Sequence, residues 1–475
     1  MNFTKWYEAK ENSKILILEK EELNFEKYKN QKYDYIYLNG TLEYMSIDQI
    51  KLVKQLLNDE GTLFIAVDNK IGVKYIVGDK SKHCNKIYDS LKGNFEKGKL
   101  YTKNELDKII QELGFKYYRY YFPLPNYERP SMIFTDKYLP NKNSSKINYN
   151  VIYDEESLIV QDEINLLKIF TEENKFTEFT NSYIIELSNT PIDESVKYYS
   201  FNNMRKDRYS LILKMTDEYV EKIAENDEAL EHINNINRNS KLLKQLGFNV
   251  AEEDEEGIVK SKLIKLKQLD EYILNLIEEN KINEAYEIID DWYRIIQEKL
   301  KPDENGFIEN GFIDMVFENI FYNEQEKTYI LFDQEWYKEN IPIKFIIYRS
   351  INNLYAHNPK IESIIPQNEM LKHYNIKKDE YKKQEEQIQN EVIDTKKQEF
   401  YSKQYNFMIN SEELKQIIQD VKKLNKDNIE LLEGVKELRE KIKHKDEIIT
   451  QQKQLLEEPL KNKIIRKIKE KNKKG

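Results

Sequence analysis

Two acidic residues and one amide fall at a spacing that could place them in one site. Asp314 and Asn319 are five residues apart in the segment DMVFEN, and Asp333 follows fourteen residues later in LFDQEW. A carboxylate can orient a hydroxyl group and accept its proton. An amide oxygen and a second carboxylate are ligands of the kind that Mg²⁺ prefers. If the fold brings them together, these three side chains could serve a hydroxyl substrate and a metal ion.

The spacing resembles the DxxxxN…IDxE pattern of the kinase-like phosphotransferases, notably the small-molecule kinases. That resemblance implies that Asp314 is the catalytic base and that Asn319 and Asp333 hold magnesium between the phosphates of ATP. It also implies that Glu335 supports the metal shell.

The upstream half of the kinase pattern is less complete. Lys222 is placed like the lysine that holds the α and β phosphates, and Glu228 or Glu231 on the following helix would pair with it. The stretch 182–210 contains no glycine, and therefore no glycine-rich phosphate loop. A kinase fold that has lost its activity remains an alternative.

The other residues that often do chemistry show no ligand spacing. The single cysteine, Cys84, has a histidine beside it but no third group to orient the pair. We expect the five histidines to be incidental surface or core residues: His83, His232, His357, His373 and His444.

Ahead of the kinase-like segment, short apolar runs alternate with stretches of helical spacing. This pattern indicates an α/β unit with a largely parallel sheet. Two helices are expected, each followed by a glycine that would cap it, Gly61 and Gly114. The expected helices are 47–57 and 102–113, and the expected strands are 15–18, 35–38, 63–67, 117–122 and 132–134.

The segments YDYIYLNGTLEY (33–44) and DEGTLFIAV (59–67) resemble the second half of the class I S-adenosylmethionine (SAM)-dependent methyltransferases. The branch most similar is the one found beside bacterial surface-glycan genes. The resemblance implies a Rossmann-like fold in which Asn39, Gly40 and Glu43 lie near the cofactor.

The start of the sequence departs from that family. Its members hold SAM on a glycine-rich turn after the first strand and on an acid that ends the second. Neither feature occurs before Tyr33, so the first two strands are expected to be missing. We therefore expect residues 1–140 to form a methyltransferase-like remnant that binds SAM weakly or not at all.

The polar stretch 140–149 predicts a linker, after which strands and helices no longer alternate regularly. Residues 150–365 are expected to form an α+β kinase-like domain, with a strand at 179–187 and a hairpin at 210–224. Residues 366–410 are rich in Lys, Glu and Gln and read as a polar helical linker.

The clearest periodicity lies near the C-terminus. Apolar residues recur at the two core positions of a heptad repeat within 411–458, which predicts a coiled coil and self-association. Asn428 falls at a core position, where it would fix the register. The segment 459–475 carries eight Lys or Arg and one Glu around an apolar face. It reads either as an amphipathic tail attracted to an anionic membrane surface or as a solvated basic terminus.

Composition limits the class of protein. The chain has 475 residues, a net charge of -10, and no apolar run long enough to cross a bilayer. The acidic balance argues against nucleic acid as a partner, and the lone cysteine suits a reducing compartment. A cytoplasmic protein is expected.

The order of methyltransferase-like unit, kinase-like unit, coiled coil and basic tail resembles the bacterial O-antigen chain-terminating methyltransferase–kinases. That resemblance implies a protein on the inner face of the cell membrane that modifies the end of a surface polysaccharide, beside other glycan-synthesis enzymes. Two alternatives remain: a catalytically inactive scaffold on the membrane side, and an active SAM-dependent methyltransferase.

Overall fold

The computed structural model describes residues 6–19, 25–140, 147–253, 255–405 and 411–473. The chain divides into two compact units, residues 1–408 and 409–475. The first unit holds all of the sheets and both candidate sites, and the second is a single helix.

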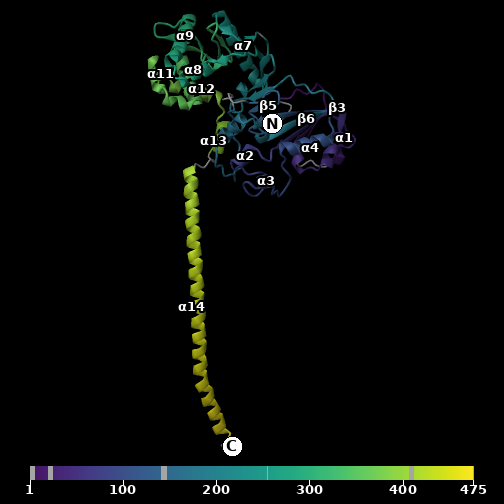
Figure 1. The fold of residues 1–475 in the computed structure, drawn as a ribbon, viewed down its shortest axis with the longest axis vertical. Helices are drawn as coiled ribbons and strands as arrows, with labels where there is room; N and C mark the ends of the chain where they lie inside the picture. The colour runs from purple at the N-terminus through teal and green to yellow at the C-terminus, as the bar shows by residue number, and fades with distance from the viewer. Residues whose placement is uncertain (1–5, 20–24, 141–146, 254, 406–410, 474–475) are drawn as a thin grey trace. The chain divides into compact units, whose positions relative to one another are not determined.

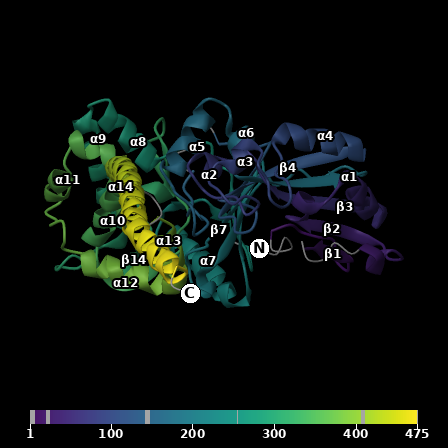
Figure 2. The same cartoon turned by 90° about the horizontal axis from the view of Figure 1, so that it is seen from below.

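An eleven-stranded sheet runs through the first unit (Figures 1 and 2). The strands β1, β2 and β3 are parallel, whereas every later pair across the sheet is antiparallel. The sheet is therefore mixed, and the prediction of a largely parallel sheet holds for one end alone. The order across the sheet is β1 (Ile15–Leu18), β2 (Tyr33–Asn39), β3 (Leu57–Asp68), β6 (Ser182–Ser188), β4 (Tyr117–Leu124), β5 (Met132–Thr135), β7 (Tyr198–Phe201), β8 (Leu211–Met215), β9 (Tyr219–Ala224), β12 (Val259–Lys262) and β11 (Glu252–Glu253).

Strand β6 lies within the part of the sheet that β1 to β5 form. It lies between β3 and β4 and is antiparallel to both, with Ile185 opposite Ile65 on one side and Tyr120 on the other. All seven of its residues are buried. The strand expected at 179–187, which the sequence assigns to the second domain, thus completes the sheet of the first. A boundary near residue 140 does not separate two sheets.

Local signals mark the starts of α1 (Ile47–Gln55) and α4 (Lys103–Leu113) and the end of α4. Ser46 begins α1 and Thr102 begins α4, each with a capping box. Gly114 ends α4 in the left-handed conformation, as predicted. Gly61 lies inside β3, so the prediction that it caps a helix was wrong. The shorter elements here are η3 (Phe25–Tyr28), η4 (Thr41–Tyr44), α2 (Val73–Ile76), α3 (Asp89–Lys92), α5 (Glu163–Glu172) and α6 (Phe176–Phe179).

Two smaller sheets and most of the helices form the other half. One sheet has the order β10 (Asn249–Val250), β16 (Thr328–Leu331), β15 (Ile320–Asn323), β13 (Lys267–Gln268), and the other pairs β14 (Phe307–Phe312) with β17 (Tyr337–Pro342). The helices are η5 (Asp207–Tyr209), η6 (Asp227–Ala229), α7 (Leu230–Gln245), α8 (Leu269–Glu278), α9 (Ile282–Leu300), η7 (Phe317–Asn319), α10 (Lys344–His357), η8 (Pro359–Ser363), α11 (Gln367–His373), α12 (Lys382–Val392) and α13 (Thr395–Tyr405). In Figure 2, β1–β3 and α8–α12 lie at opposite ends of the unit.

The stretch expected to be a polar linker belongs to this second core. Met370, Leu371, Tyr381 and Ile388 are buried in the same apolar cluster as Trp292. A few apolar side chains are enough here, because α11 and α12 pack on a core that α8, α9 and α10 already supply. This part of the chain therefore lies on the domain and does not merely lead away from it.

The second unit is α14 (Ser411–Lys471), one helix of 61 residues (Figure 1). It continues past Pro459, where the sequence predicts a change from coiled coil to tail. Its described side chains are exposed, including the apolar ones at both heptad core positions, such as Val421 at 50% for one position and Leu424 at 61% for the other. Among the described residues, no helix is both long and apolar enough to pass through a bilayer.

Candidate functional site

A short connection joins the two larger sheets. β12 belongs to the eleven-stranded sheet and β13 to the four-stranded one, and residues 263–266 link them. Beside this connection lies a cavity of about 450 Å³. Apolar side chains such as Leu213 and Val259 line it, together with the stacked rings of Phe321 and Phe332, whose centroids are 4.4 Å apart. Such a slot suits a flat, partly apolar ligand.

Lys222 and Asp333 reach this cavity from different sheets. Lys222 lies on β9, and Asp333 follows β16. The ammonium group forms ion pairs with Asp333 and with Glu335, at 2.7 Å from Glu335 Oε1. Burial favours the neutral amine, but the two carboxylates outweigh it, so the pKa of Lys222 is raised. The lysine therefore carries its charge at neutral pH.

The backbone of Asp333 has an unusual conformation. Its φ is 58°, in the left-handed region that residues other than glycine rarely adopt. Its N–H donates to Oε1 of Glu252 on β11 at 2.6 Å. Glu252 is itself buried, which raises the pKa of its carboxyl group to about 7. Because this contact holds a strained residue in place, the orientation of Asp333 is set by the fold.

Asp314 is held from two directions. Its Oδ2 accepts the backbone N–H groups of Glu335 and Trp336, each at 3.1 Å, and its Oδ1 accepts Nη1 of Arg349 at 3.1 Å. Burial raises the pKa of Asp314 to about 7, although Arg349 acts in the opposite sense. A carboxyl group with a pKa near neutrality and a fixed orientation is suited to act as a general base.

Asn319 lies beside both aspartates. Its side-chain amide donates to the backbone oxygens of Asp314 at 3.1 Å and Asp333 at 3.4 Å. Because the NH₂ group donates to these two backbone oxygens, the carbonyl oxygen of the side chain remains as an acceptor. The structure thus brings together all three residues that the DxxxxN…D spacing selects.

Glu335 is the centre of the charge network. Its Oε1 pairs with Lys222, and its Oε2 pairs with Arg205. Nε2 of His232 lies 3.3 Å from the same Oε2. Burial opposes ionisation, but Arg205 and Lys222 hold the pKa of Glu335 well below its usual range. Glu335 binds basic side chains, which is a different contact from the metal support that the resemblance implied.

The acids expected to pair with Lys222 do not contact it. Glu228 lies on η6 and Glu231 in the first turn of α7, and both are exposed. From α7 it is His232 that enters the network, stacked on the ring of Trp336 at 4.8 Å between centroids. The pairing of Lys222 with Glu228 or Glu231 was wrong, and His232 is not incidental.

A second cavity, of about 430 Å³, lies on the other side of Asp333. Asp333 lines both cavities, whereas Asp314 and Asn319 line the second one alone. Helix α12 contributes Ile388 and Gln389 to the second cavity. Two spaces of this size that share Asp333 in their lining could hold two different ligands.

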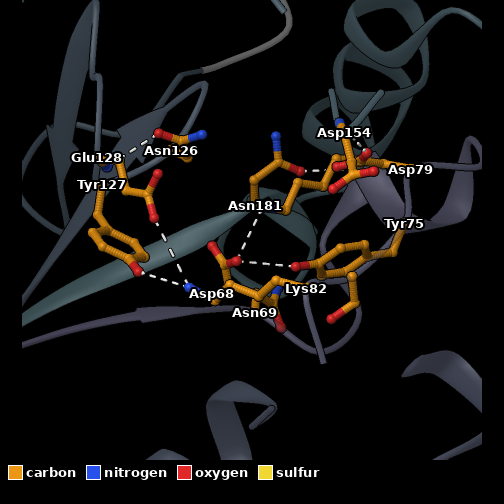
Figure 3. Close-up of polar contacts among 12 residues, drawn as sticks. Asp68, Asn69, Tyr75, Asp79, Lys82, Asn126, Tyr127, Glu128, Asp154 and Asn181 are labelled. Carbon is orange, nitrogen blue, oxygen red and sulfur yellow. Dashed lines mark hydrogen bonds and ion pairs between the residues drawn. The ribbon is translucent and has the colours of Figure 1, made fainter. Parts of the chain in front are cut away.

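The residues expected near SAM lie at the end of β2 and in η4. Beside them, at the end of β3, a different polar cluster forms (Figure 3). Asp68 ends β3 and accepts Nζ of Lys74 at 3.1 Å and the hydroxyl of Tyr75 at 3.0 Å. Nearby, Lys82 donates to the hydroxyl of Tyr127 at 3.2 Å, as Figure 3 shows. The charges in this cluster are therefore satisfied by other protein groups.

Asn39, Gly40 and Glu43 are engaged in the same region. The amide of Asn39 donates to Glu19 at 2.9 Å, and the buried Glu43 contacts Nε2 of His83 at 2.5 Å. Gly40 has a φ of 67°, and a Cβ built on it would lie 2.5 Å from the hydroxyl of Tyr127. Each of the three residues thus already has a protein group as its neighbour.

Metal-binding groups are few. The described residues contain no group of three or more His, Cys, Asp or Glu arranged to hold a metal ion. Asp333 and the side-chain oxygen of Asn319 supply two hard oxygen ligands. Mg²⁺ commonly takes one or two protein ligands and completes its shell with water and substrate phosphates, so this donor set fits it.

Solved structures similar to this chain include both methyltransferases and kinase-like proteins. A SAM-dependent methyltransferase from Thermotoga maritima, a possible histamine N-methyltransferase, is 12% identical and aligns over 34% of this chain and 58% of its own, with a TM-score of 0.19. LicA in complex with AMP is 19% identical over 37% of this chain and 75% of its own, with a TM-score of 0.18. WbdD, solved with the kinase inhibitor LY294002, is 12% identical over 70% of this chain and 63% of its own, with a TM-score of 0.22.

The chain thus spans less than two thirds of the length of that methyltransferase and of WbdD. No family model matches the sequence, and no curated protein is similar to it. At these identities and TM-scores the comparisons assign neither an activity nor a substrate.

Proposed function

We propose that the chain is a phosphotransferase that uses ATP and Mg²⁺ to phosphorylate a hydroxyl group. The observation that carries this proposal is the meeting of Lys222 with Asp333, Asn319 and Asp314 at the junction of two cavities. The apolar cavity beside residues 263–266 would take the base of the nucleotide. The acceptor would enter the second cavity, which Asp314 lines.

Asp314 would orient the acceptor hydroxyl and take its proton. The hydroxyl oxygen forms a bond to the γ-phosphorus while the bond from that phosphorus to the bridging oxygen breaks, and ADP leaves. The backbone N–H groups of Glu335 and Trp336 fix the carboxylate in place. Most of the catalytic effect expected of such a site comes from positioning and charge.

Lys222 would exchange partners when the nucleotide binds. Its ammonium group now pairs with Asp333 and Glu335. Nucleotide phosphates would take the place of Asp333, and Glu335 would keep the lysine in position. Asn319 and Asp333 would hold Mg²⁺, which supplies neutralisation of the charge on the phosphates.

The residues at the end of β2 do not favour an active methyltransferase. The hydroxyl of Tyr127 lies over Gly40, and Asn39 is bonded to Glu19, an acid that would repel the carboxylate of SAM. These residues do not fit the cofactor. We therefore assign the methyltransferase-like half a structural part, in which the pairing of β5 with β7 joins it to the kinase-like half.

The biological setting belongs to the same proposal. We place the protein on the inner face of a bacterial cell membrane, where it would phosphorylate the end of a surface polysaccharide beside other glycan-synthesis enzymes. The basic end of α14 supports this placement, since Ile464, Ile465 and Ile468 are exposed among lysines. Such a helix can bind anionic lipid.

Isothermal titration of the full chain with a non-hydrolysable ATP analogue and Mg²⁺ tests the proposal. Binding should be measurable and should be lost in Asp333→Ala. Asp59→Ala is the matched control, because Asp59 is exposed at the start of β3, away from both cavities, and its removal should change nothing. A parallel titration with SAM should give no heat.

If the full chain bound no nucleotide at millimolar concentration, the catalytic proposal would fall. The protein would then be an assembly protein whose domains have lost their chemistry. SAM binding in the same experiment would instead revive the methyltransferase alternative.

A further inference from the structure

The loop between β7 and β8 stands where a phosphate loop would be expected. It covers residues 202–210, and these two strands directly precede β9, which carries Lys222. The loop sequence, NNMRKDRYS, contains no glycine. Side chains at every position hinder the close approach of backbone N–H groups to phosphate oxygens that glycines permit.

A side chain of this loop reaches the site instead. Arg205 lines the second cavity with Asp314, Asn319 and Asp333, and its guanidinium group pairs with Glu335. The Arg205 side chain is 24% exposed, so part of its guanidinium group faces the cavity while Glu335 binds another part. The ring of Trp336 lies 5.7 Å from the guanidinium carbon and supports it from a second direction.

The backbone of Arg205 is fixed by a segment far along the chain. The N–H of Lys206 donates to the oxygen of Val392 at 2.9 Å, and the N–H of Asp394 donates to the oxygen of Met204 at 3.0 Å. Lys397 adds a bond to the backbone oxygen of Arg205 at 2.9 Å. The loop is therefore held on both sides of Arg205, as a rigid phosphate-binding element needs to be.

We propose that Arg205 binds the phosphates of the nucleotide and replaces the backbone N–H groups of a glycine-rich loop. This inference rests on the proposed function and names a further ligand-binding residue for it. A guanidinium group presents several N–H donors in one plane and binds phosphate oxygens in pairs. Arg205 and Lys222 share Glu335 as a partner, so one acid positions both cations for the same phosphate chain.

The charges in the site favour this assignment. Four acids line the second cavity: Asp314, Glu318, Asp333 and Glu335. Apart from Arg205, their basic partners are Lys222 and Arg349, together with His232 and His357. The end of the phosphate chain must reach this cavity to meet the acceptor, and an excess of acids there would repel it. Arg205 supplies the missing positive charge at the loop that faces the incoming ligand.

The test compares two ligands that differ only in their phosphates. The affinities of adenosine and of the β,γ-imido analogue of ATP with Mg²⁺ are measured on the full chain and on Arg205→Gln. Loss of a charge-assisted contact should weaken the ATP analogue on the order of ten- to a hundredfold. Adenosine should bind both proteins alike. Arg208→Gln is the matched control, since it removes the same kind of charge from an exposed position in the same loop, and it should leave both affinities unchanged.

Each result decides the inference. An equal loss of both ligands, or no loss of either, would overturn it while leaving the proposed function standing. Failure of the unmodified chain to bind either ligand would overturn the proposed function as well. If Arg205→Gln melts at a clearly lower temperature, Arg205→Lys takes its place, and it should show a smaller loss confined to the ATP analogue.

Discussion

Among single residues, Asp314 should set the pH dependence of the reaction. Burial raises its pKa to about 7, and the base must be the carboxylate. The fraction in that form rises as pH rises through about 7, so kcat/KM should increase with pH up to this value and level off above it. A pH–rate profile of the full chain with saturating ATP and Mg²⁺ measures this limb.

Asp314→Asn tests the role of Asp314 as a base separately from its role in the structure. The amide keeps an oxygen for the N–H groups of Glu335 and Trp336 but cannot take a proton. We expect kcat to fall about 10²- to 10⁴-fold, with unchanged nucleotide affinity and no acidic limb. A variant that kept both its rate and its acidic limb would show that another group accepts the proton.

The part of the site that lies within one short stretch of sequence was predictable. Asp314, Asn319 and Asp333 are close in the chain, and their spacing is visible without a structure. The residues that orient them come from far away: the contact of Arg349 spans 35 residues and that of Arg205 spans 130. No local pattern marks such residues, because the fold alone brings them into contact.

At the scale of elements, the pairing of β14 with β17 positions the segment that carries Asp314. The chain leaves β14 just before Asp314, and it enters β17 just after Glu335 and Trp336, whose N–H groups bind that aspartate. A Cβ at Gly311 on β14 would lie 2.2 Å from the backbone oxygen of Lys338 on β17. The two strands would have to separate to accommodate it.

Gly311→Ala should therefore damage both the fold and the activity. We expect the free energy of unfolding to fall by about 1–3 kcal/mol, the cost typical of overpacking, and we expect phosphotransfer to drop with it. Urea unfolding followed by tryptophan fluorescence measures the first effect. Gly434→Ala is the control, because nothing lies within 4 Å of its Cβ position on α14, and helix propensity should make it neutral or slightly stabilising. Equal stability of the two variants would contradict the importance given to this strand pair.

Elements were easier to predict than their partners. Capping boxes and apolar runs mark the ends of α1 and α4 and the strands β2 and β4, because these signals are local. The place of β6 between β3 and β4 depends on residues about 120 positions apart, and a run of apolar residues does not encode its neighbour. The same reason explains α12, whose polar sequence hid the few side chains that reach the core.

For the molecule as a whole, the exposed stripe on α14 needs a partner, and we expect a second copy of the same helix. Ile417, Leu424, Leu431 and Leu438 recur every seven residues and are 48–68% exposed. A helix in water that shows such a stripe normally buries it against another helix. Asn428 falls at a core position of the same repeat, where paired amides would fix the register. Sedimentation analysis of the full chain should therefore show an oligomer.

Charge placed in the stripe should separate the copies without touching the first unit, residues 1–408. Leu431→Glu combined with Leu438→Glu would bring like charges together at the seam and should yield monomers. Glu433→Lys, on the outward side of the same repeat, should leave the oligomer intact. Because α14 is a compact unit of its own, nucleotide affinity should be the same in the monomeric variant. An oligomer that survived both glutamates would mean that the chains associate elsewhere, and a loss of nucleotide affinity on dissociation would mean that the site is completed only in the assembly.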